Sequence, residues 1–152
     1  MKKLSETRDI LDYIEHLHHQ LGETYKALDT NVSDPRAHLL LEYLEAMENK
    51  SAEALHGYSR DSINAALREW EPADLDDHVV RERLATLQHP DVSANELLDA
   101  ALDVAEWFGE FFGELERAST APEQTELFRS LRDRAEREKK RLARNANMLS
   151  DF

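Results

Sequence analysis

Three ionisable residues lie on the apolar stripes of predicted helices and are the first candidates for chemistry: His18, Glu48 and Glu138. Burial of such side chains costs free energy unless each finds a partner. Together they would offer one imidazole nitrogen and two carboxylate oxygens, a set that suits Fe, Mn or Zn. The sequence therefore leaves two interpretations open, three separately satisfied polar residues or one shared site for a single divalent metal ion.

Other polar motifs are interpreted as surface features. Glu53 and His56 form a Glu-x-x-His motif, but Glu53 lies off the apolar stripe and the motif is near the predicted end of its helix. His16 and His19 share the polar face of the first helix. Four aromatic residues follow helical spacing: Trp107, Phe108, Phe111 and Phe112. They could line a ligand pocket, although such residues more often form core or dimer contacts.

The elements that must position these residues are helical. Apolar residues at three- and four-residue spacing predict four long helices, at about residues 5–29, 35–57, 94–118 and 121–149. Asp34 before Pro35 predicts an N-cap. The single domain, residues 1–152, is expected to be all-α.

The segment between the second and third long helices is a crossover over residues 59–92. It contains two shorter helical patterns, at 63–70 and 75–87, and no strand pattern is visible. Short turns make each pair of long helices antiparallel, whereas the long crossover lets the second and third run parallel. This order predicts an up-down-down-up four-helix bundle with one crossover.

Composition excludes several classes of function. The chain has 152 residues, no cysteine and a formal net charge of −13. Disulfides and thiolate sites are excluded, and the charge argues against nucleic-acid binding. We expect no signal peptide and no membrane span, hence a cytoplasmic protein. Residues 129–144 are locally basic and could form a strip that binds an anionic partner. We expect them instead to lie beside acidic residues 93–118.

Four pairs of residues, one pair on each long helix, have spacings that recur in a known family: His18 and Tyr25, Glu48 and Ser51, Ala105 and Phe112, Ala135 and Glu138. The pattern resembles the ferritin-like proteins, and their rubrerythrin-like branch in particular. In that branch the first and third helices carry a Glu seven residues before an aromatic residue. The second and fourth carry Glu-x-x-His, and the bundle holds two iron ions.

The chain departs from this pattern at most ligand positions. His18 replaces a Glu, Ser51 replaces a His, and Glu138 replaces a His. Ala105 and Ala135 stand where the family has Glu. The side chain of alanine has no donor atom for a metal. The resemblance therefore implies a ferritin-like bundle with a degenerate di-iron site.

Two functions are expected from these observations. The first is a non-enzymatic bundle without cofactor that acts through association, as a homodimer or with a protein partner. The second is a protein that binds a single metal ion, Fe, Mn or Zn, or has redox activity. It would use His18, Glu48 and Glu138 as a remnant site.

Overall fold

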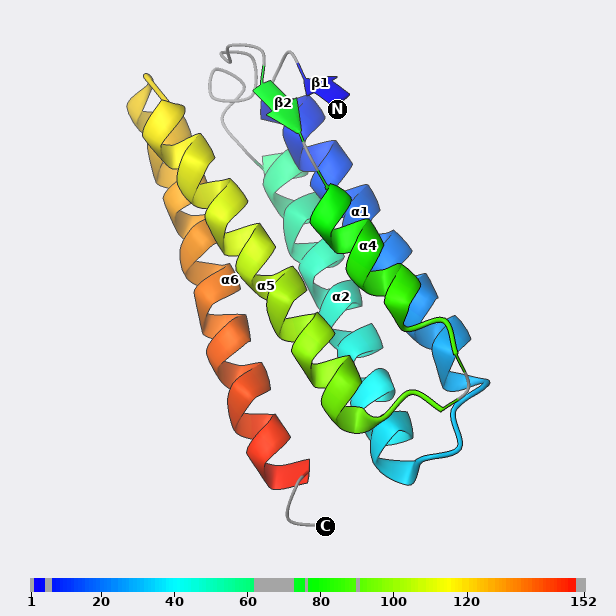
Figure 1. Ribbon diagram of the computed structural model, residues 1–152. Coiled ribbons are helices and arrows are strands. Elements are labelled where there is room, and N and C mark those ends of the chain that lie inside the picture. Colours follow the sequence, from blue (N-terminus) through cyan, green and yellow to red (C-terminus); the bar gives the residue numbers. More distant parts are fainter. Residues whose placement is uncertain (1, 5–6, 62–72, 76, 90, 150–152) are drawn as a thin grey trace.

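Four long helices packed in pairs make up most of the computed structural model, which describes residues 2–4, 7–61, 73–75, 77–89 and 91–149 (Figure 1). The elements follow in the order β1 (Lys2–Leu4), α1 (Thr7–Asp29), α2 (Pro35–Asp61), β2 (Ala73–Leu75), α4 (His78–Thr86), α5 (Ala94–Ala118) and α6 (Pro122–Leu149). The all-α prediction and the four long helices are confirmed.

The helices pack as two antiparallel pairs, α1 with α2 and α5 with α6 (Figure 1). The pairs meet where α2 contacts α5, and these two helices run in the same direction. The short helix α4 belongs to the connection between them and packs against α5. Its Val80 is fully buried, which anchors the connection to the core.

Local sequence signals explain where two helices begin. Asp34 accepts a hydrogen bond from the backbone N–H of Arg36 at 3.0 Å, directly before α2. Ser93 accepts one from the backbone N–H of Glu96 at 3.1 Å, at the start of α5. Both side chains satisfy amide groups that the first turn of a helix leaves without a partner.

The core takes buried apolar side chains from all four long helices and from the connection. Helix α5 has the widest apolar surface because it contacts α6, α2 and α4. Within the described residues, the exposed large apolar side chains are Leu39 and Val79. In that part of the chain, every helix is too short or too polar to cross a bilayer.

The connection differs from the sequence prediction. Strands β1 and β2 pair in antiparallel register, Lys2 with Leu75 and Leu4 with Ala73, where no strand was predicted. Three residues are too few to show a two-residue alternation, so the pattern was not visible. The second predicted helical pattern forms α4, and the first, at 63–70, lies outside the described residues.

Helix α2 continues to Asp61 and does not stop near Gly57 as predicted. A Cβ at Gly57 would meet nothing within 4 Å. Gly57→Ala is therefore expected to raise the free energy of unfolding by about 0.5–1 kcal/mol in urea denaturation, because alanine loses less backbone entropy in a helix.

Gly22→Ala provides the matched control. Its Cβ would lie 3.1 Å from Asn49 Oδ1, so strain opposes the same gain in helix propensity. Equal stabilisation by the two substitutions would contradict this explanation.

Candidate functional site

The three predicted site residues line one cavity inside the bundle, with a volume of about 40 Å³. His18 comes from α1, Glu48 from α2 and Glu138 from α6. The remaining wall is mostly apolar: Met47, Leu55, Ala101, Val104, Phe108, Phe112 and Leu131. His18 and Glu48, which are 30 positions apart in the sequence, therefore face the same small space as Glu138 from the last helix.

His18 and Glu48 form a buried pair at this cavity. The residues are 8% and 3% exposed, and His18 Nδ1–H donates to Glu48 Oε2 at 2.5 Å. The imidazole stacks on Phe108, with ring centroids 4.3 Å apart and planes 15° apart. The ring is thus fixed by one hydrogen bond and one aromatic contact, so both side chains are already oriented before any ligand binds.

Glu138 is half-buried and is held by two weaker contacts. Ser51 Oγ donates to Glu138 Oε2 at 3.3 Å, longer than the usual range for a hydroxyl donor. Arg134 Nη2 lies 3.4 Å from Glu138 Oε1, and Arg134 also lines the cavity. Arg134 was not among the residues predicted from the sequence, although its i, i+4 spacing to Glu138 indicates a contact between the two side chains.

The positions where the chain departs from the ferritin-like pattern line the same cavity. Ser51, Ala105 and Ala135 all belong to its wall, as does Phe112. The alignment of the four helices that the resemblance implied therefore brings its ligand positions together in space. The replaced positions contribute small side chains and thus open room beside His18 and Glu48.

The donor atoms of His18, Glu48 and Glu138 are not yet gathered around one point. In the described part of the chain, three such atoms lie within 4.8 Å of one another only at Asp29, His38 and Glu42. Two donors that bind one metal ion at about 2.1 Å in tetrahedral geometry are about 3.4 Å apart. For His18 Nδ1 and Glu48 Oε2 to bind the same ion, Nδ1 must lose the proton that it donates to Glu48, and the two atoms must move apart by about 1 Å. Glu138 must also turn away from Arg134.

Tyr25 is buried next to this pair. Burial, and then the negative charge of Glu48, raise the pKa of the Tyr25 phenol above its ordinary value of 10. On α1, Tyr13 has a pKa raised to about 12, by burial and by its hydrogen bond to Asp77. Both phenols therefore keep their protons at a pH where an unfolded chain loses them.

The protein is expected to lose stability as the pH rises above 10. The folded state binds more protons there than the unfolded state, so Tyr25 alone lowers the free energy of unfolding by about 1.4 kcal/mol per pH unit. Tyr25→Phe should make this decline less steep in urea titrations between pH 8 and 11.5. A decline that is equally steep in both proteins would contradict the assignment.

The other candidate residues from the sequence lie at the surface. His56 is exposed and lies 3.1 Å from Glu15, and Glu53 of the Glu-x-x-His motif is also exposed. His16 and His19 are exposed on the wall of an open hollow between α1 and α4, with a volume of about 420 Å³. Both observations agree with the surface interpretation.

The basic segment lies beside acidic residues of α5. Arg129 Nε lies 2.9 Å from Glu116, and Arg132 also pairs with Glu116. Lys139 Nζ lies 3.9 Å from Glu106. The local positive charge is thus partly balanced within the chain, as predicted.

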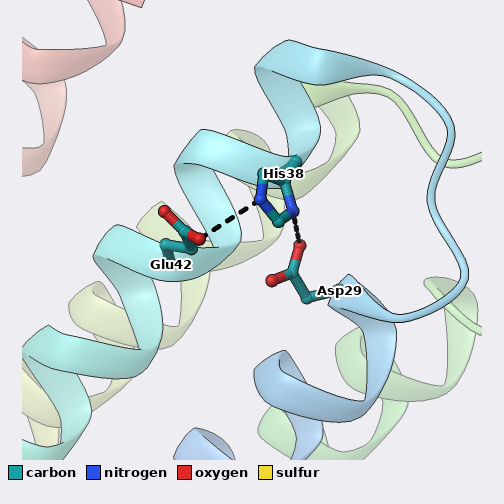
Figure 2. A group of neighbouring side chains, drawn as sticks. All are labelled: Asp29, His38 and Glu42. Carbon is teal, nitrogen blue, oxygen red and sulfur yellow. Dashed lines mark hydrogen bonds and ion pairs between the residues drawn. The ribbon is translucent and has the colours of Figure 1, made fainter.

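Asp29, His38 and Glu42 form a second group, which sequence analysis missed (Figure 2). His38 lies between the two carboxylates, with Nδ1 facing Asp29 and Nε2 lying 3.2 Å from Glu42 (Figure 2). One imidazole can give a metal only one of its nitrogens, so this arrangement suits a pair of side-chain contacts that join the end of α1 to the start of α2. His38 is exposed, so the contacts of this group contribute little to the free energy of unfolding.

Comparison of the chain with protein-family models, with curated proteins and with solved structures gave no match. Function is therefore inferred from the residues of the cavity.

Proposed function

We propose that the protein is a ferritin-like bundle that binds one divalent metal ion, Fe, Mn or Zn, through His18, Glu48 and Glu138. The observation that carries this proposal is the convergence of these residues, from three helices, on one interior cavity. One nitrogen and two oxygens are a suitable donor set for these metals. The two carboxylates also balance the charge of a divalent ion.

A full di-iron centre does not fit this cavity. Ala105 and Ala135 supply no donor, and Ser51 replaces an imidazole with a hydroxyl. The three remaining donors are too few to hold two ions. We therefore assign no ferroxidase or oxygen-activating chemistry to the protein.

A second candidate is a metal-free bundle that acts through self-association or a protein partner. It is favoured by the pairing of the interior groups, because His18 with Glu48 and Ser51 with Glu138 already satisfy one another. A metal would have to replace these contacts. The two candidates thus differ in whether an ion enters the cavity.

Binding of cobalt(II), followed by tryptophan fluorescence, can distinguish the metal-binding protein from the metal-free bundle. Phe108 contacts both His18 and Trp107, the latter with ring centroids 5.1 Å apart. In a Trp70→Phe protein, emission comes from Trp107 alone. A paramagnetic ion in the cavity should quench the Trp107 emission. The quenching should reach its limit at about one equivalent of cobalt(II) per chain.

His38→Ala is included in this protein, so that the surface group cannot contribute. Glu48→Gln keeps the shape and hydrogen bonding of the pair but removes a charged donor, and it should weaken cobalt binding at least tenfold. No saturable quenching, or equal quenching with Glu48→Gln, would favour the metal-free bundle.

A further inference from the structure

The basic residues of α6 fall into two groups that differ in their partners. One group already faces carboxylates within the chain: Arg129, Arg132, Arg134 and Lys139. The other group is exposed, and in the part of the chain that the structure describes no ion pair joins it to an acid: Arg137, Lys140, Arg141 and Arg144. We call this second group the basic row. Helix α6 packs mainly on α5 at the edge of the bundle, so the basic row is left open (Figure 1).

The basic row occupies one side of α6. Its members lie three, four and seven residues after Arg137, which places them on one helix face over about 10 Å. The buried Leu131 and Leu142 lie on the other side of the helix, toward the core. The nearest acids on the outer side, Asp133 and Glu136, come one turn before the row, and among the described residues neither forms an ion pair with it. The row therefore presents positive charge to solvent.

Helix stability does not account for this arrangement. Arg137 and Arg141 are like charges four residues apart, as are Lys140 and Arg144, and such pairs destabilise a helix. Cations stabilise the C-terminal turn of a helix, but the last turn of α6 contains no basic residue. An anionic partner bound across the row would relieve the repulsion.

The charges of the chain define the kind of partner. Guanidinium groups match carboxylates in a bidentate geometry, and most members of the row are arginines. The whole chain has a formal net charge of −13. A duplex nucleic acid or an anionic membrane extends far beyond the row and would be repelled by the acidic surface around it. A short partner is not repelled in this way, because salt screens charges that are more than about 8 Å away.

We propose that the basic row of α6 binds a short acidic segment of a partner protein, with three or four carboxylates within about 10 Å. The surface is independent of the metal site, because it faces away from the core. Its binding does not require a metal ion.

The test measures the binding of a fluorescently labelled peptide of eight glutamates to the full chain, by fluorescence anisotropy at about 50 mM salt, where screening is weak. Arg137→Gln combined with Arg141→Gln should weaken binding about tenfold, because two exposed ion pairs are lost. Arg129→Gln combined with Arg132→Gln is the matched control. It removes the same charge from the same helix, but from arginines that already pair with Glu116, and it should change the affinity by less than about twofold.

Four results would overturn the proposal. The first is no saturable binding of the peptide to the unmodified protein. The second is equal weakening by the two double variants when circular dichroism shows both to be folded, because the peptide would then respond only to net charge. The third is tighter binding of a short DNA duplex than of the peptide. The fourth is a dimer, detected by sedimentation, that Arg137→Gln combined with Arg141→Gln dissociates, since a second copy would then occupy the row. None of these results bears on the metal site.

Discussion

Replacing His18 with leucine is expected to lower the free energy of unfolding by about 3–5 kcal/mol. The substitution leaves the carboxylate of Glu48, only 3% exposed, without its hydrogen-bond donor. Leucine can still pack against Phe108, so lost packing contributes little. Urea denaturation of the metal-free protein at neutral pH measures the change.

The double substitution His18→Leu and Glu48→Leu is the informative control. Apolar residues in place of a whole buried polar pair are often neutral or stabilising, so the double variant should recover most of the loss. That result would mean that the pair is not needed for stability, as expected if it serves to bind a ligand. A double variant as unstable as His18→Leu would instead indicate a structural role.

Restoring the missing donors is expected to change the metal stoichiometry from one to two. The triple variant Ser51→His, Ala105→Glu and Ala135→Glu places an imidazole and two carboxylates on the wall of the same cavity. Two irons bridged by carboxylates would then have a sufficient set of ligands. Iron per chain after anaerobic loading measures the effect.

The isosteric variant Ser51→Asn, Ala105→Gln and Ala135→Gln controls for overpacking of the cavity. It adds similar volume without charge and should bind no second ion. Folding of both variants is checked by circular dichroism. A folded restored variant that still binds at most one iron would contradict the ferritin-like alignment.

Much of the fold could be predicted because the helices are amphipathic and capped. The apolar stripes of α1 and α5 can be recognised from the spacing of their residues. The N-caps Asp34 and Ser93 can be recognised from the residues that follow them. The end of α2 could not be predicted, because Gly57 only weakens a helix and tertiary contacts decided the outcome. The strands were too short to leave a pattern.

Part of the candidate site could be predicted because its polar residues lie at positions where the helical spacing expects buried apolar side chains. His18 and Glu48 interrupt apolar stripes, and such residues are rarely buried without a partner. Arg134 was missed because a long side chain can reach inward from the edge of a stripe. The contact between Asp29 and His38 depends on the geometry of the turn that separates them, which spacing along a helix does not describe.

The metal content of the protein tests the central claim most directly. His38→Ala protein and its Glu48→Gln derivative are loaded with manganese(II), iron(II) or zinc(II), passed through a desalting column and measured by elemental analysis. For at least one of these metals, we expect about one ion per chain in the first protein and a residual amount in the second. No retained metal in either protein, or two ions per chain in the first, would contradict a single-metal site at His18, Glu48 and Glu138.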